Sequence, residues 1–233
     1  MNRRSRSAAA GSGRPARPSG RGTGWSDRSE ARPSRSPSSS RSSRSDASPA
    51  ELPVLRVGFV PGVEPDRFGR RWRSGGRAAR LELIPVPLSR QSAVLAEREV
   101  DMCFVRLPLT SPELPELHLV NLWEERPTAV VGTENVLSLH EELTLADLAE
   151  DPEIAPEHDD DAADRIAVVA SGVGHARLPL SLARLHHRKD VVHREITDAE
   201  STHIALAWPT SEDDDVRQDF VATVRGRTPR SSR

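Results

Sequence analysis

The chain has 233 residues, of which 36% are hydrophobic, 29% are charged and one is cysteine, and its formal net charge is −2. This length suits one large domain or two small lobes. The single cysteine, Cys103, excludes an intramolecular disulfide framework and a cysteine-based zinc cage. Apolar runs fall short of the ~18 residues of a membrane span, which excludes an integral membrane protein.

The first fifty residues differ in composition from the rest of the chain. They contain 11 Arg, no Lys and 3 acidic residues, whereas the remainder contains 22 basic and 32 acidic residues. Because Val, Ile and Leu are absent before Leu52, residues 1–51 are predicted to be a disordered basic tail that cannot offset its ordering entropy. The basic start lacks the apolar core of a secretory signal, so the protein is expected in the cytoplasm.

Three interpretations of this tail stay open. Clustered arginines attract nucleic acid by releasing phosphate counterions, which makes a nucleic-acid-associated protein the alternative function. The tail could equally be an inert solvated arm. A third interpretation is that translation starts further downstream, because 32 of the 33 basic residues are Arg and Tyr is absent, as a GC-biased genome would give.

From Pro53 onwards the sequence alternates between predicted strands and predicted helices. Pro65 fits the first turn of one helix, and Ser89 is a predicted cap for a second helix that reaches Glu99. Short apolar runs predict three strands, at residues 54–60, 81–86 and 101–105. This order predicts a parallel sheet with helical crossovers. Ligands on such sheets bind beyond the carboxyl ends of the strands, here the loops 61–64, 87–91 and 106–110.

The second half of the chain predicts further short elements. Thr144 begins a capping box for a helix through Leu148, and Gly172 predicts the end of a helix over residues 165–170. Residues 156–164 are predicted to be an acidic loop. Three further strands are predicted at 126–131, 191–196 and 203–208. One short helix is predicted to end over residues 184–189 and another to span 216–224, followed by a basic tail at 227–233.

Several segments resemble the effector-binding domain of LysR-type transcriptional regulators. Their order and spacing together carry the resemblance, which covers roughly residues 53–226. The matching segments are 55–59, 99–108, 145–148, 168–174, 178–181, 191–198 and 204–208. The first and third predicted strands, in segments 55–59 and 99–108, come in the same order along the chain as the corresponding strands of this family.

The resemblance implies an α/β, two-lobed type 2 periplasmic-binding-protein-like fold over residues 52–226, which encloses a small effector between its lobes. Lobe I would comprise 53–123 and 197–226, and lobe II 124–196, shortened between 154 and 166. By the same resemblance, ligand-binding residues are expected at Gly62, Ser89, Gln91, Arg106, Pro108, Thr128 and Gly174. His175, next to Gly174, is a further candidate, and the alternative is that it only covers the edge of a lobe.

The chain also departs from the family pattern. Family regulators begin with a winged helix-turn-helix and a long linker helix, and residues 1–50 lack the apolar periodicity that these need. DNA binding by that route is therefore not expected. The best resemblance is to stand-alone actinobacterial proteins that consist of the effector-binding domain alone.

Arg106 is the residue whose chemistry most directly predicts a ligand. A guanidinium that follows the third strand, together with the N-terminus of a helix after Ser89, would suit a carboxylate or a phosphate. The alternative is that Arg106 forms a structural salt bridge with one of the many acidic residues.

No cofactor, metal or catalytic residue is predicted. Gly172 and Gly174 lack the third glycine of a dinucleotide motif, and the acidic loop 156–164 lacks the spacing of a calcium loop. Cys103 is expected to be a buried apolar residue. A hydrolase or transferase would need a nucleophile–base pair, and none is apparent at a telling spacing.

The sequence therefore predicts a non-enzymatic sensor that closes two lobes on a small molecule, in the first instance an organic anion. Such a module would influence transcription through a partner regulator or as a homodimer. No membrane partner is expected.

Overall fold

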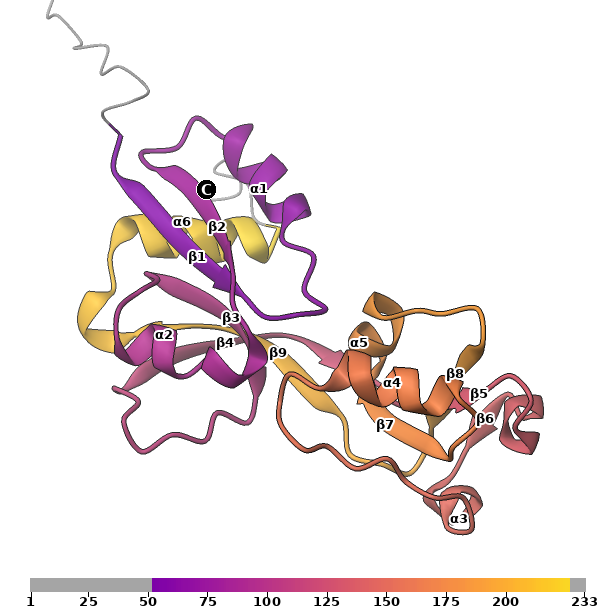
Figure 1. Ribbon diagram of the computed structural model, residues 1–233. Helices are drawn as coiled ribbons and strands as arrows, with labels where there is room; N and C mark the ends of the chain where they lie inside the picture. The colour runs from indigo at the N-terminus through magenta and orange to yellow at the C-terminus, as the bar shows by residue number, and fades with distance from the viewer. Residues whose placement is uncertain (1–51, 227–233) are drawn as a thin grey trace, which may run out of the picture. The chain divides into compact units, whose positions relative to one another are not determined.

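The computed structural model describes residues 52–226, which fold into two β-sheets with helices packed against them (Figure 1). The strands are β1 (Val54–Phe59), β2 (Arg80–Pro85), β3 (Met102–Leu107), β4 (Leu117–Glu125), β5 (Pro127–Gly132), β6 (Glu142–Leu143), β7 (His175–Pro179), β8 (Val191–Ile196) and β9 (Thr202–Pro209). Their order is β2-β1-β3-β9-β4 in the first sheet and β6-β8-β5-β7 in the second.

The helices divide between the two sheets. They are α1 (Asp66–Arg73), α2 (Ala93–Ala96), α3 (Leu145–Leu148), α4 (Ala162–Ala170), α5 (Leu180–Leu185) and α6 (Asp215–Val224), with 3₁₀ turns η1 (Leu88–Arg90), η2 (Val136–Leu139) and η3 (Thr210–Glu212). We call the first sheet with α1, α2 and α6 lobe I, and the second sheet with α3, α4 and α5 lobe II. Within residues 52–226, no helix is long and apolar enough to cross a bilayer.

The parallel sheet predicted for the first three strands is confirmed. In lobe I, β1 runs parallel to both β2 and β3, while β9 pairs antiparallel with β3 and β4. The strand that contains Pro85 lies at the edge of the sheet, where a missing N–H is tolerated. The carboxyl ends of β1, β2 and β3 therefore meet at one edge.

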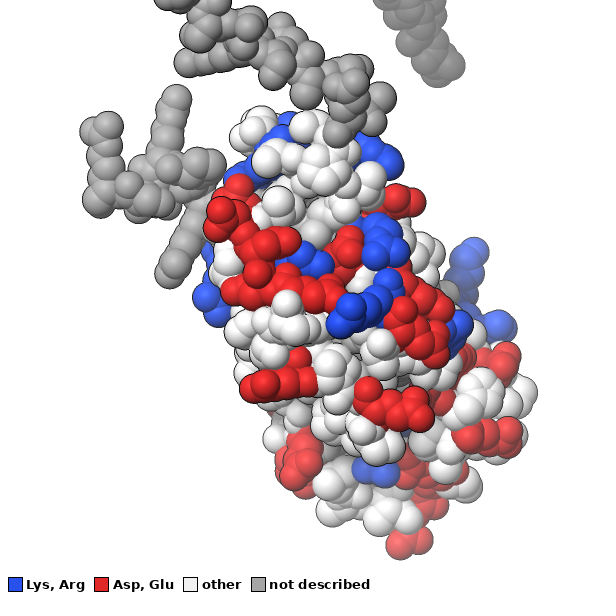
Figure 2. Space-filling model, turned by 90° about the vertical axis from the view of Figure 1, so that its left-hand side faces the viewer, with Lys and Arg blue, Asp and Glu red and all other residues white. Residues whose placement is uncertain are grey.

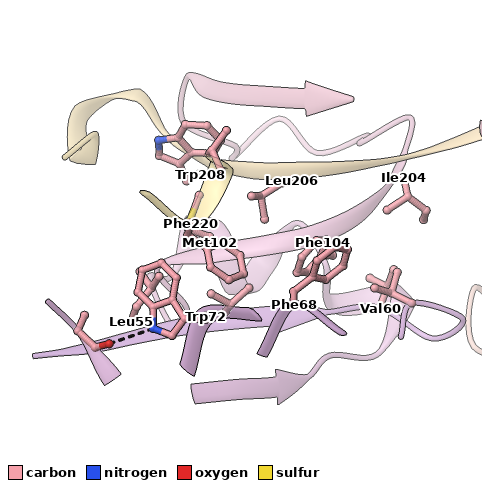
Figure 3. Packing of buried hydrophobic residues seen from close by; sticks show 14 residues of the cluster. Leu55, Val60, Phe68, Trp72, Met102, Phe104, Ile204, Leu206, Trp208 and Phe220 are labelled. Carbon is pink, nitrogen blue, oxygen red and sulfur yellow. Dashed lines mark hydrogen bonds between the residues drawn. The ribbon is translucent and has the colours of Figure 1, made fainter. Parts of the chain in front are cut away.

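Aromatic side chains form the centre of lobe I (Figure 3). Phe68 from α1 stacks on Phe104 from β3 at 5.2 Å between ring centroids, and Phe220 from α6 meets Trp72 edge-on at 5.5 Å. The indole N–H of Trp72 donates to the Ala79 carbonyl at 3.0 Å. The opposite face of the sheet packs against Val94 and Leu95 of α2, so lobe I has helices on both faces.

Lobe II is built around the central strand β5, which pairs antiparallel with β7 and β8. Helices α4 and α5 pack on one face of this sheet, and α3 and η2 on the other. The predicted capping box is confirmed, since the Thr144 hydroxyl accepts from the Asp147 N–H while the Asp147 carboxylate accepts from the Thr144 N–H. Gly172, with φ of 90°, ends α4 as predicted.

Two predicted helices are wrong in extent. The helix expected from Ser89 to Glu99 is only η1 followed by the four-residue α2, because Arg98 takes a positive φ of 57° and turns the chain so that Val100 can be buried. The helix expected to end over residues 184–189 is α5, which begins directly after Pro179 and ends at Leu185. Strand β7 was not predicted, since its five residues follow a glycine pair and include two basic side chains.

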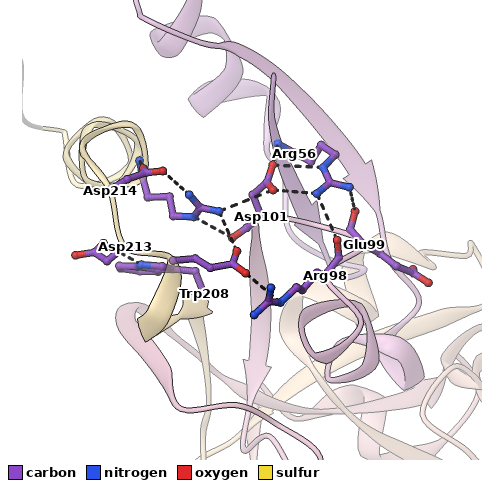
Figure 4. A network of polar contacts seen from close by, with 9 residues as sticks. Arg56, Arg98, Glu99, Asp101, Trp208, Asp213 and Asp214 are labelled. Carbon is purple, nitrogen blue, oxygen red and sulfur yellow. Dashed lines mark hydrogen bonds and ion pairs between the residues drawn. The ribbon is translucent and has the colours of Figure 1, made fainter. Parts of the chain in front are cut away.

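A network of charged residues ties α6 to the start of lobe I (Figure 4). The Arg56 guanidinium lies 3.0 Å from the Asp101 carboxylate, and Arg217 of α6 donates to the Asp101 carbonyl and pairs with Asp214. On the face drawn in Figure 2, acidic and basic side chains lie intermixed. The basic residues of this network are therefore matched by carboxylates within the protein.

Candidate functional site

The carboxyl ends of β1, β2 and β3 carry five of the predicted ligand-binding residues, namely Gly62, Ser89, Gln91, Arg106 and Pro108. Gln91 holds two of these strand ends together, because its amide nitrogen donates to the Arg106 carbonyl at 3.1 Å and its amide oxygen accepts from the Arg106 N–H at 2.8 Å. Pro108 follows β3 through a cis peptide bond with Leu107.

The Arg106 side chain is buried in an ion pair. Its Nε lies 2.6 Å from Glu125 Oε2, and the side chains of Arg106 and Glu125 are only 6% and 3% exposed. Nη2 also donates to the Pro61 carbonyl and to Ser181 Oγ, each at 3.1 Å, whereas Nη1 has no partner among the described residues. The charge of Arg106 is thus compensated within the protein, as in the salt-bridge alternative.

Ser181, the second residue of α5, brings lobe II against this ion pair. Its hydroxyl donates to Glu125, and Glu125 also accepts from Thr202 at 3.3 Å. Gly62 lies so close that a Cβ at this position would be 2.5 Å from Ser181 Oγ. Side chains of lobe II therefore cover the ends of β1 and β3, and we call Arg106, Glu125, Ser181 and Thr202 the lobe junction.

Ser89 makes a second contact between the lobes. Its hydroxyl and its backbone N–H both donate to the carboxylate of Asp160, which belongs to the acidic loop before α4, and the N–H bond measures 3.3 Å. The predicted helix N-terminus after Ser89 is not formed, because α2 has only four residues. A carboxylate nevertheless occupies the position that was expected to attract one.

The other three predicted residues lie in lobe II. The Thr128 hydroxyl is buried and donates to the Leu178 carbonyl at 2.8 Å. Gly174 has a positive φ of 56° and approaches Pro152. His175 Nδ1 lies 2.9 Å from the Asp151 carboxylate, and the His175 side chain is 3% exposed. The structure therefore does not bring these three together with the lobe I residues.

Three open cavities on lobe II each have one of these three residues in their lining. Thr128 lines a cavity of about 420 Å³. His175 lines one of about 560 Å³, and Gly174 one of about 350 Å³. Within residues 52–226, no group of three His, Cys, Asp or Glu side chains is arranged to hold a metal ion.

Sequence reasoning missed Glu125, Asp160 and Ser181. Each contacts its partner across a long sequence separation, such as the 71 residues between Ser89 and Asp160. Ser181 lies in the matching segment 178–181 and Asp160 in the acidic loop 156–164, but neither pattern predicts the contact that the residue makes. The only sequence signal for Glu125 is its position at the end of β4, the strand that leads from lobe I into lobe II.

Cys103 lies mid-strand in β3, and burial raises the pKa of its thiol to about 12. Because the thiolate is the reacting form, we expect iodoacetamide to leave Cys103 unmodified in the native protein at pH 8 and to label it after unfolding in urea. Mass spectrometry of the intact protein measures this difference. Equal labelling of the native and unfolded protein would contradict the burial of this thiol.

A family model and several solved structures match this chain. The LysR substrate binding domain model matches residues 52–167. The effector binding domain of BenM with its effector benzoate superposes with a TM-score of 0.60 at 19% identity, over 74% of this chain and 90% of that one. No curated protein sequence matches the chain.

Two further solved structures superpose on this chain with similar TM-scores. A hydrogen-peroxide-bound mutant of OxyR from Corynebacterium glutamicum has a TM-score of 0.58 and 14% identity, over 75% of this chain and 67% of that one. Full-length CbnR in complex with its target DNA has a TM-score of 0.58 and 17% identity, over 76% of this chain and 71% of that one. At these identities the likeness shows the fold.

Proposed function

The chain belongs to the LysR substrate binding domain family and has its two-lobed periplasmic-binding-protein-like fold, and from this premise we propose that it senses a small organic anion. Membership of this family makes it a ligand-binding regulatory module. The anionic nature of the effector, the residues that contact it and the absence of catalysis belong to the proposal.

The observation that carries the proposal is the contact between Ser89 and Asp160. One N–H and one O–H group of the same residue, at the end of a parallel strand, donate to a single carboxylate. Hydrogen bonds from two converging donors are what a carboxylate ligand needs. In the proposal, an effector carboxylate takes the place of the Asp160 carboxylate at Ser89.

Arg106 has a supporting part in this proposal. Since Glu125 already compensates its charge, Arg106 contributes through Nη1, the group that has no partner among the described residues. This group becomes available to an anion only when lobe II moves away from the lobe junction. Anion binding would therefore favour a different arrangement of the lobes from the one with Asp160 at Ser89, and a ligand shifts such an equilibrium by its differential affinity.

A changed arrangement of the lobes is a signal that a partner can recognise. In the proposal, the anion-bound and anion-free forms present different surfaces to a second regulator or a second copy of the chain. Such a role needs no chemical step, which fits the non-enzymatic effector domains of this family. The expectation that the protein acts in the cytoplasm remains part of the proposal.

A thermal-shift screen of the full-length protein tests the proposal, with benzoate, succinate, citrate and glycerol 3-phosphate as probes. We expect at least one anion to raise the melting temperature, since binding at 100 times the dissociation constant contributes about 2.7 kcal/mol. Ser89→Ala should reduce that gain, while the matched control Ser211→Ala, at an exposed serine, should retain it. The absence of a shift with every probe would overturn the proposal.

Asp160→Ala provides an independent prediction for the same site. Because this substitution removes the internal carboxylate that competes for Ser89, the anion found in the screen should bind more tightly, by roughly tenfold in its dissociation constant. Isothermal titration calorimetry measures the change, with Asp159→Ala as the neighbouring control. Weaker binding to Asp160→Ala would show that Asp160 supports the anion instead of competing with it.

A further inference from the structure

Two neighbouring cavities on lobe II lie apart from Ser89 and Asp160. The first, of about 420 Å³, is lined by the starts of β5 and β9 and the end of β8. The second, of about 560 Å³, is lined by the segment from α3 to Glu153 and by His175. Leu145 and Arg177 line both cavities, so the two share a common wall. Volumes of this size suit small-molecule ligands.

The lining of both cavities carries an excess of negative charge. Asp198 and Glu200 line the first, and Glu150 and Glu153 line the second. The one guanidinium in the lining, that of Arg177, is already bonded to Glu153 at 2.9 Å. The segment that contributes most of the second lining is also acidic, because residues 134–164 contain 12 acidic residues and no Arg or Lys. These cavities therefore favour a cation.

His175 adds a hydrogen-bond acceptor at the second cavity. The residue is 2% exposed, and its Nδ1 lies 2.9 Å from the Asp151 carboxylate, whereas its Nε2 has no hydrogen-bond partner among residues 52–226. In the neutral tautomer that donates from Nδ1 to Asp151, Nε2 is an acceptor. Such an acceptor in the wall of an acid-lined cavity is matched by a ligand that carries N–H donors.

Leu145 gives the shared wall an apolar surface. Its side chain is 39% exposed, although it lies between two cavities. Leu178, Pro179 and Ile196 extend this apolar surface into the first cavity. A hydrocarbon segment laid over Leu145 would remove it from water, which is favourable at about 25 cal/mol per Å² of apolar area.

We propose that the two cavities form a single site for an aliphatic diamine or polyamine. One ammonium group binds at Asp198 and Glu200, the hydrocarbon chain crosses Leu145, and a second ammonium group donates to His175 Nε2 beside Glu150. An organic cation is favoured over a metal ion because the described residues contain no cluster of three metal ligands. The lining of this site shares no residue with the anion site at Ser89.

The first cavity also touches both connections between the lobes. Its lining includes Pro127 at the start of β5 and Thr202 at the start of β9, and Thr202 donates to Glu125 of the lobe junction. A diamine in this cavity therefore lies beside Thr202, whose hydrogen bond to Glu125 connects the cavity to the lobe junction. Its binding is coupled to the arrangement of the lobes through Thr202.

Calorimetric titration of the full-length protein with 1,5-diaminopentane and with n-pentylamine tests the proposal. We expect the diamine to bind more tightly than the monoamine by at least roughly tenfold, because only the diamine spans both acidic ends. Equal affinities, or no binding of the diamine, would overturn the proposal.

A matched pair of variants separates this site from general attraction to acidic protein. The double variant Glu150→Gln with Glu200→Gln removes one carboxylate from each cavity, and neither side chain makes a hydrogen bond within the described residues. It should weaken diamine binding by roughly tenfold. The control, Glu64→Gln with Glu124→Gln, makes the same charge change on lobe I and should have little effect. Equal weakening by both double variants would overturn the proposal.

Discussion

Replacing Glu125 with alanine is expected to destabilise the protein by about 3–5 kcal/mol, because it leaves the buried guanidinium of Arg106 without its counter-ion. The two side chains are 6% and 3% exposed, so the guanidinium that loses its counter-ion is shielded from bulk water. The hydroxyls of Ser181 and Thr202 also lose their acceptor. Urea unfolding followed by circular dichroism gives the change in the free energy of unfolding.

Two further variants identify the buried charge as the cause. Glu124→Ala, at the exposed neighbouring residue, should change the free energy of unfolding by at most about 0.5 kcal/mol. The double variant Arg106→Met with Glu125→Leu should recover much of the stability, since a buried ion pair can be replaced by apolar residues of similar volume. A loss below about 1 kcal/mol in Glu125→Ala would mean that the lobe junction is hydrated or open in solution.

Gly174→Ala is expected to cost about 2–5 kcal/mol, from a left-handed backbone and from overpacking together. Gly174 has φ of 56°, and an added Cβ would lie 1.8 Å from the Pro152 carbonyl oxygen. That oxygen accepts from the His175 N–H, so its displacement breaks the bridge between the segment after α3 and β7. Thermal unfolding of the purified variant measures the loss.

Gly172→Ala is the matched control for this prediction. Gly172 has a comparable positive φ of 90°, but an added Cβ would meet no atom within 4 Å. Only the backbone strain remains, which costs about 1–2 kcal/mol. If the two variants were equally stable, the close approach of Gly174 to Pro152 would contribute nothing to the cost of the substitution, contrary to this expectation.

The two lobes meet through internal carboxylates. Glu125 of lobe I accepts from Ser181 of lobe II, and Asp160 of lobe II accepts from Ser89 of lobe I. This arrangement stabilises the contact between the lobes. If the proposed function holds, an anionic effector must compete with this contact, and its affinity depends on the stability of the contact.

Much of the architecture follows from local patterns in the sequence. The apolar runs around Val57 and Phe104 predict buried strands, and their order with the helix of Phe68 and Trp72 predicts the parallel half of the lobe I sheet. Thr144 predicts its capping box from residues only three apart. These features depend on neighbours in the chain, so their physical causes can be read without tertiary structure.

The extents of short elements were harder to predict. The helix after Ser89 ends early because Val100 becomes buried, and β7 forms because its backbone pairs with β5. Both outcomes depend on burial and pairing against distant segments. Local propensity alone does not specify them.

The candidate site depends most strongly on tertiary structure. The sequence by itself identified Arg106 and Ser89 at strand ends, because parallel strands bring their carboxyl ends to one edge. It could not determine whether Arg106 faces a ligand or an acid, since both partners offer the same carboxylate chemistry. Folding decided this by bringing Glu125 and Ser181 to Arg106, and Asp160 to Ser89, from 19, 75 and 71 residues away. Such pairings follow from the packing of whole elements, which no local pattern of residues encodes.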